Sequence, residues 1–234
     1  MVNQILFGEH FKVLDQRIKW SKIRLAHDKY EGWICNKQWT EIDKESYENL
    51  ERQSPTLTTE LLDIVTCESH QTIALGSSLP HYENGTFTIQ ENSYTHGGET
   101  TTGSEDKNML VNNAMLYLNT PYLWGGRTPF GIDCSGFSQI VYRLQGKEIP
   151  RDAYQQAKQG ELIQNIDDVQ RGDLIFFINA NNKIHHVGIA IDNNSIIHAS
   201  GKVRIDYLND KGIIHTKSKS LTHKFHSIKR VTHY

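Results

Sequence analysis

The fold is decided by residues 131–144, which read GIDCSGFSQIVYRL. Four apolar side chains recur there at i, i+3, i+4 and i+7, the spacing of one buried helical face: Phe137, Ile140, Val141 and Leu144. Asp133 stands just before the apolar run, and aspartate is a preferred N-cap residue. The pattern therefore predicts a helix that begins at Cys134 and runs to about Leu144.

Cys134 occupies the first position of this predicted helix. The positive end of the helix dipole and the unpaired N–H groups of the first turn favour a thiolate there. Gly136 keeps the first turn open, so we expect a substrate to approach the sulfur. Cys134 is therefore the candidate nucleophile, whereas we expect Cys35 and Cys67 to be small buried side chains.

A cysteine nucleophile needs a base and a third group that orients the base. The candidates are His185, His186 and His198, in predicted strands over 184–191 and 196–199. Consecutive strand residues point to opposite faces, so we expect His185 and His186 to diverge. The small residues on the His186 side leave room for a helix end. The three histidines could instead bind a metal, but no carboxylate or second cysteine gives a common zinc spacing, so we expect no metal.

The rest of the chain divides near residues 100–105. Before that point, strand-like runs over 1–38 and 56–95 flank a short helix over 43–52, and Asn84-Gly85 predicts a hairpin turn. Residues 96–107 read as a linker. Thr102 and Glu105 have capping-box spacing ahead of a predicted helix over 109–118. A shorter helix follows over 152–159, and then strands over 174–178, 184–191, 196–199, 203–207 and 226–231, so the second part is α+β.

Composition excludes several classes of protein. The 234 residues carry 25 Lys plus Arg and 27 Asp plus Glu, a net charge of −2, so we expect no nucleic-acid or anionic-membrane partner. The apolar run over 174–178 is far shorter than the ~20 residues that cross a bilayer. The first residues lack the pattern of a secretory signal, and three cysteines make no disulfide framework. We therefore expect a cytoplasmic protein, and we expect a monomer.

Five motifs in order resemble the NlpC/p60 family of cell-wall peptidases: YLWGG at 122–126, DCSGF at 133–137, RGDL at 171–174, HVGI at 186–189 and IHAS at 197–200. The resemblance implies a papain-like α+β catalytic domain over 105–234. It makes Cys134 the nucleophile, His186 the general base and His198 the residue that orients the base. Tyr122 then helps to hold the oxyanion. No cofactor is implied.

The first part is similar to bacterial SH3-like modules, one over 1–38 and a second, less clear one over 39–100. Relatives with this arrangement are γ-D-glutamyl-L-diamino acid endopeptidases, which cut small peptides such as L-Ala-γ-D-Glu-meso-diaminopimelate with a free L-alanine amine. The resemblance implies substrate-binding residues in both parts: Tyr30, Trp124, Asp133, Ser135, Arg151 and Asp152. Asp133 and Tyr30 would meet the amine, and Ser135, Arg151 and Asp152 would line the D-glutamate pocket.

Two departures from the family bear on specificity. Relatives begin with one more strand carrying an acidic residue for the amine, and this sequence begins after it, so we expect a truncated start or a weaker amine site. Ala153 replaces a common serine. The expected function is murein-peptide hydrolysis in cell-wall recycling. Two alternatives stay open: an amidase or acyltransferase on the same scaffold, and a non-catalytic protein that binds cell-wall peptides.

Overall fold

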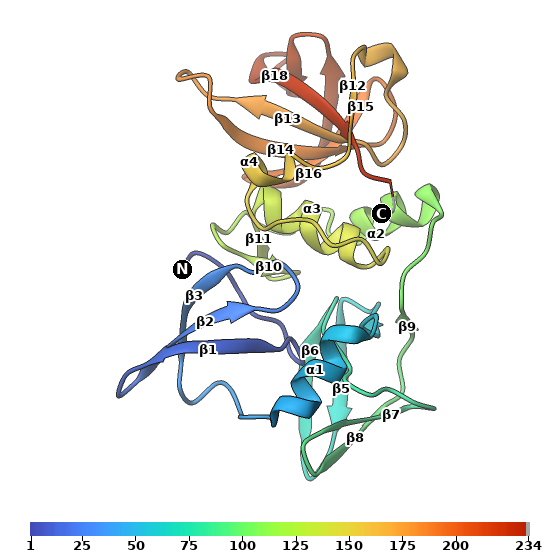
Figure 1. Ribbon diagram of the computed structural model, residues 1–234. Helices are drawn as coiled ribbons and strands as arrows, with labels where there is room; N and C mark the ends of the chain where they lie inside the picture. Colours follow the sequence, from blue (N-terminus) through green and yellow to red (C-terminus); the bar gives the residue numbers. More distant parts are fainter. Residues whose placement is uncertain (233–234) are drawn as a thin grey trace. The chain divides into compact units, whose positions relative to one another are not determined.

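The computed structural model describes residues 1–232 and divides the chain into two compact units, Val2–Gly103 and a second that begins at Ser104. The first unit opens with an antiparallel meander of β1 (Phe11–Gln16), β2 (Trp20–Leu25) and β3 (Glu31–Cys35) (Figure 1). Helix α1 (Lys44–Arg52) follows, and the Asp43 side chain caps it by accepting from the Ser46 N–H. These elements match the strands and helix that the sequence predicts.

A four-stranded sheet completes the first unit. Its order is β6 (His70–Ala74), β5 (Leu62–Thr66), β8 (Asn92–His96) and β7 (Thr86–Ile89), and β4 (Leu57–Thr58) pairs separately with β9 (Thr100–Thr101). Asn84 and Gly85 both have positive φ, as expected for a tight turn. That turn closes only the isolated bridge between Glu83 and Thr86. The predicted turn at Asn84-Gly85 is confirmed, but it does not pair the runs on either side of it, because β7 pairs with the unpredicted strand β8. Strands β8 and β9 also shorten the expected linker.

Two helices of the second unit precede the sheet. Helix α2 is Lys107–Leu116, and its N-cap is Asp106, whose side chain accepts from the Asn108 N–H. The capping box at Thr102 and Glu105 was therefore wrong, since a closer carboxylate satisfies the helix start. Helix α3 is Cys134–Arg143, with Asp133 as its N-cap, as predicted. All ten residues of α3 are buried rather than one face only, because α2, β14 and β15 all pack against it.

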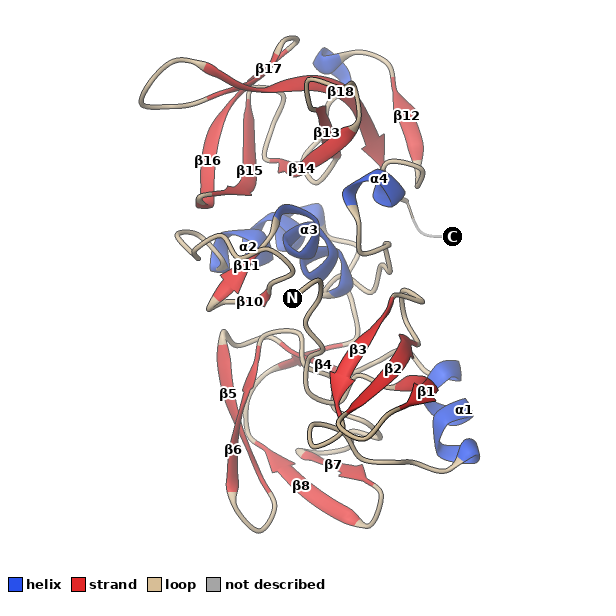
Figure 2. Ribbon diagram, turned by 90° about the vertical axis from the view of Figure 1, so that its left-hand side faces the viewer, coloured by secondary structure: helices blue, strands red, loops and turns tan. Residues whose placement is uncertain are grey.

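The remaining strands form one curved antiparallel sheet. Its order is β12 (Glu161–Ile163), β18 (Leu221–Arg230), β13 (Leu174–Ile178), β14 (Ile184–Ala190), β15 (Ser195–Ser200), β16 (Lys202–Asn209) and β17 (Gly212–Ile214). Strand β17 also pairs with β18, which closes the sheet into a barrel (Figure 2). The short strands β12 and β17 were not predicted. The α+β expectation is confirmed, with helices first and the sheet after them.

Smaller elements connect the helices to the barrel. The two-residue strands β10 (Arg127–Thr128) and β11 (Gly131–Ile132) lie just before α3. Helix α4 is Ala153–Gln156, shorter than expected, and a 3₁₀ turn covers Ile166–Asp168. Among the residues that the structure describes, no helix is both long and apolar enough to span a membrane.

The barrel interior is apolar at one end and polar at the other. Its buried cluster includes Ala190, Ile196 and Leu208, with Phe225 packed against it. Four polar side chains lie on the same strands, each two or four residues from a member of this cluster. Even spacing in a strand puts them on the same face as the cluster. They are His186 on β14, His198 on β15, Asp206 on β16 and His223 on β18. The barrel therefore gathers these groups from four strands.

Candidate active site

The loop before α3 is packed too closely for side chains at its glycines. A Cβ on Gly136 would lie 2.4 Å from the Gly126 carbonyl oxygen, and a Cβ on Gly126 would lie 2.3 Å from the Gly131 oxygen. We expected Gly136 to open the first helical turn to substrate. The space beside it is instead filled by the preceding loop. This packing fixes the position of Cys134 at the start of α3.

Asp133 holds several groups around the helix start. Its Oδ1 accepts from the Gly136 N–H at 2.7 Å, and its Oδ2 accepts from the Gly125 N–H at 2.7 Å. Arg151 donates to both oxygens, at 3.0 and 2.6 Å, and also to the Ser135 hydroxyl at 2.9 Å. Four strong acceptor positions of the carboxylate are thus occupied. Asp133, Ser135 and Arg151 are brought together as one buried network beside Cys134.

The sulfur of Cys134 is buried against β14. The N–H of Val187, the residue after His186, and the N–H of Ser135 both face it. Val187 can donate there because β14 pairs with β15 only at Ile189 and Ala190, so its N–H lies beyond the paired segment. This contact brings the nucleophile to the strand that carries His186.

Burial raises the pKa of the Cys134 thiol to about 12, and the charge of Asp133 adds to this effect. The two backbone N–H groups and Arg151 oppose it only in part. Burial likewise holds the pKa of His186 well below its usual range. We had expected the helix N-terminus to favour a resting thiolate; instead, both shifts favour a neutral thiol and a neutral imidazole in the free protein, because desolvation outweighs the N–H groups.

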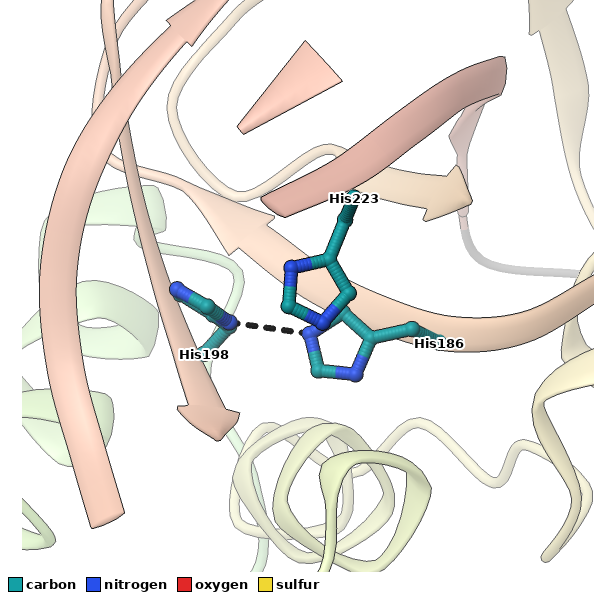
Figure 3. A group of neighbouring side chains, drawn as sticks. All are labelled: His186, His198 and His223. Carbon is teal, nitrogen blue, oxygen red and sulfur yellow. Dashed lines mark hydrogen bonds between the residues drawn. The ribbon is translucent and has the colours of Figure 1, made fainter. Parts of the chain in front are cut away.

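His186, His198 and Asp206 form a continuous chain of buried hydrogen bonds. The Nε2 of His186 lies 2.8 Å from the Nδ1 of His198 (Figure 3), and the Nε2 of His198 lies 3.1 Å from Oδ2 of Asp206. The two strands approach closely because Gly188 has no side chain. A Cβ there would lie 2.9 Å from the His198 Cβ. The space beside Gly188 is thus filled by β15, not by a helix end as predicted.

Asp206 decides which nitrogens of this chain carry protons. Burial would raise its pKa, but hydrogen bonds from His198, Thr216 and Arg204 hold it well below its usual value, so the group is an ionised acceptor. His198 must then donate through Nε2, which leaves its Nδ1 to accept from Nε2 of His186. The lone pair of His186 consequently lies on Nδ1, where it can accept a proton.

Sequence reasoning missed Asp206 and His223. Asp206 lies in β16, and the alternation of residues along that strand does not show that a carboxylate faces the interior of the barrel. His223 lies before the predicted strand over 226–231 and outside the motifs, yet its ring stacks on His186 with centroids 4.1 Å apart. A bulge between β13 and β14 leaves His185 without a partner on β13. His185 is exposed and His186 buried, but the two rings stay 6.3 Å apart, so they diverge less than the expected opposite faces.

The remaining predicted residues lie in different surroundings. Tyr122 is partly buried near Cys134, and burial, together with the charges of Cys134 and Asp133, raises its pKa to about 12, so its hydroxyl stays a donor. Trp124 is 68% exposed in the adjoining turn. Asp152 caps α4. Tyr30 belongs to the first unit, where its N–H donates to Asp28.

Known proteins share both parts of the chain. Residues 119–221 match the NlpC/P60 family, and residues 1–38 match the bacterial dipeptidyl-peptidase Sh3 domain. The chain is 30% identical to a γ-D-glutamyl-L-lysine dipeptidyl-peptidase of Bacillus cereus over 90% of this chain and 72% of that protein. A Bacillus subtilis protein of the same name is 41% identical over 38% of this chain and 31% of its own length.

The fold also has a solved counterpart. A crystal structure of an NlpC/P60 family protein from Bacillus cereus superposes with a TM-score of 0.80, covering 98% of this chain and 81% of that one at 23% identity. The likeness therefore extends over both units.

Proposed function

This chain belongs to the NlpC/P60 family of cysteine peptidases, and we propose that it hydrolyses the bond between γ-D-glutamate and a diamino acid in peptidoglycan stem peptides with a free N-terminal L-alanine. The observation that carries the proposal is the buried chain from His186 through His198 to Asp206, on the strand whose Val187 N–H faces the Cys134 sulfur. The names of the two Bacillus relatives support the choice of bond.

In the first half of the reaction, the Cys134 sulfur attacks the γ-glutamyl carbonyl carbon. The thiol proton passes to Nδ1 of His186, whose Nε2–H is already committed to His198. The carbonyl oxygen becomes an oxyanion, which the Tyr122 hydroxyl and a backbone N–H at the start of α3 stabilise. The tetrahedral intermediate then collapses, the C–N bond breaks, and His186 protonates the leaving amine.

In the second half, water attacks the thioester. His186 accepts a proton from that water, and the carbon–sulfur bond breaks as the glutamyl carboxylic acid forms. The proton returns to the Cys134 sulfur, so the neutral pair is restored. Asp206 keeps the same proton positions throughout, because it stays ionised and fixes the Nε2–H of His198.

We propose that the D-glutamate carboxylate binds beside Ser135, Arg151 and Asp152, and that the exposed Trp124 lies beside the peptide. The free ammonium group is drawn toward Asp133, whose carboxylate is partly neutralised by Arg151. An N-acetylated tripeptide has no such charge, so we expect it to be a much poorer substrate than the free tripeptide.

The test is mass spectrometry of products from L-Ala-γ-D-Glu-meso-diaminopimelate and from the L-lysine analogue. We expect L-Ala-D-Glu and the free diamino acid, and no product with Cys134→Ala. Cleavage at another bond would overturn the assignment. Our proposal takes meso-diaminopimelate as the third residue, and the ratio of kcat/KM for the two tripeptides tests it.

The same assay tests the role in recycling. A ratio of kcat/KM near one for the free and N-acetylated tripeptides would contradict a recycling enzyme and favour action on intact cell wall.

A further inference from the structure

The three imidazoles of His186, His198 and His223 converge at the polar end of the barrel (Figure 3). One nitrogen from each can be chosen so that all three lie within 4.8 Å of one another. His186 and His198 are buried, and His223 is partly buried. This triplet differs from the metal alternative that the sequence suggested, because the exposed His185 is replaced by His223 from β18.

Second partners already orient two of these rings. His198 gives its Nε2 to Asp206, which leaves Nδ1 directed at the cluster. His223 uses Nδ1 in a 2.9 Å hydrogen bond with Thr222 Oγ1, which leaves Nε2 as its ligand nitrogen. Metal-binding histidines commonly have one nitrogen on the ion and the other on a carboxylate or a similar group. The proton relay proposed above does not require His223.

We propose that His186, His198 and His223 bind a divalent transition-metal ion such as Zn²⁺, and that this ion reversibly switches the peptidase off. Three imidazoles and a water would complete the tetrahedral arrangement that Zn²⁺ prefers. The inhibition rests on the proposed role of His186 as base, whereas the binding of the ion does not.

The geometry explains why binding and activity exclude each other. Zn–N bonds are about 2.0–2.1 Å, so two nitrogens on a tetrahedral ion lie roughly 3.3 Å apart. The present 2.8 Å contact between His186 and His198 is a hydrogen bond and must open slightly, and the His223 ring, which stacks on His186, must turn to direct its Nε2 at the ion. The Nε2 of His186 becomes a metal ligand, so its proton moves to Nδ1. That nitrogen can then no longer accept the thiol proton.

Binding is tested first without activity. We use the full chain with Cys134→Ala, which removes the thiolate as a ligand, and titrate it with Co²⁺ while recording visible absorption and with Zn²⁺ by calorimetry. We expect tetrahedral Co²⁺ bands and one tight site. Adding His223→Phe, which keeps an aromatic ring, should weaken binding at least about tenfold. The matched change His226→Phe, at an exposed histidine of the same strand, should leave the affinity unchanged.

Inhibition is then measured in the parent enzyme with Zn²⁺, relative to the activity of each variant without metal. We expect chelator-reversible inhibition, with a half-inhibitory concentration at least about tenfold higher for His223→Phe. Equal affinity in the presence and absence of His223 would overturn the proposal. Loss of binding with Cys134→Ala alone would also overturn it, because the ion would then be bound by the thiolate. A protein that binds Co²⁺ through His223 but cleaves no tripeptide would contradict the proposed function, not the site.

Discussion

The Nε2 of His198 lies 3.1 Å from Oδ2 of Asp206, and both side chains are buried. Asp206 also accepts from the Arg204 Nε at 2.7 Å and from the Thr216 N–H at 2.8 Å. These donors keep the carboxylate ionised and in place. A fourth residue therefore supports the cysteine and two histidines that the sequence motifs identify.

We expect Asp206→Asn to lower kcat/KM with little change in KM. An amide can donate to His198 as well as accept from it, so the proton positions in both histidines are no longer fixed. The equivalent change in a Ser-His-Asp triad lowers kcat about 10⁴-fold, and a loss of about 10²-fold or more is expected here. Steady-state kinetics on the tripeptide measure the loss, and ¹⁵N NMR of the imidazoles reports the tautomers.

The control for this variant is Asp192→Asn, at an exposed turn between β14 and β15. It should retain full activity. Parent-like activity of Asp206→Asn, with unaltered imidazole signals, would show that Asp206 only supports the barrel.

The predictable part of the site lies in local patterns. The helix start at Cys134 and its cap at Asp133 follow from spacing within a few residues, and the strands of His186 and His198 follow from apolar runs. The closure of the barrel does not follow from such patterns, because it needs β13 to pair with β18, a strand far along the chain, as at Leu174 and Lys229. His223 reaches the site only through that closure, so no local signal could have found it.

Desolvation of the cysteine could not be predicted from local patterns either. A cysteine at a helix start favours a thiolate only while water or donors solvate it. Here the surrounding buried helix and strand remove the water, and the pKa of Cys134 rises instead. The glycines show the same limit: Gly136 and Gly188 were expected to open space, but nearby backbone and β15 fill that space.

We expect Gly188→Ala to reduce activity more than stability. The new Cβ would lie 2.7 Å from Cδ1 of Ile196 and 2.9 Å from Cβ of His198. The tip of Ile196 can rotate away, but the His198 Cβ can move only with its backbone. The His186–His198 hydrogen bond should therefore lengthen, which kcat and an NMR signal for its bridging proton would detect.

Gly97→Ala is the control for Gly188→Ala, because a Cβ at Gly97 meets nothing within 4 Å. Its activity and melting temperature should match those of the parent. If Gly188→Ala were fully active, the close approach of β14 and β15 would not matter for the relay.

We expect Arg151→Met to destabilise the second unit by about 3–5 kcal/mol, because Asp133 would keep a buried charge without its partner. The two groups are 2.6 Å apart and almost fully buried. Hydrogen exchange at the α3 amides measures the loss within this unit. Lys158→Met, at an exposed position after α4, should have little effect. Unchanged exchange in Arg151→Met would mean that Arg151 serves substrate binding alone.

The last prediction concerns the reactivity of Cys134. Its buried thiol, with a pKa of about 12, is almost entirely protonated at pH 7, whereas Cys35 and Cys67 are more accessible. We therefore expect iodoacetamide to label Cys35 and Cys67 first in the free enzyme. Because a raised pKa lowers the thiolate fraction, labelling of Cys134 should grow about tenfold per pH unit between pH 7 and 10.

Peptide mass spectrometry after timed labelling follows each cysteine separately. The Cys35→Ser and Cys67→Ser double variant is the control, and it should keep full peptidase activity and the same pH dependence at Cys134. Rapid labelling of Cys134 near pH 6, with a plateau up to pH 8, would contradict the neutral resting pair. That result would mean that the thiol has already transferred its proton to His186 before substrate binds. The N–H groups of Ser135 and Val187 would then stabilise the thiolate–imidazolium pair by more than the free energy that burial costs it.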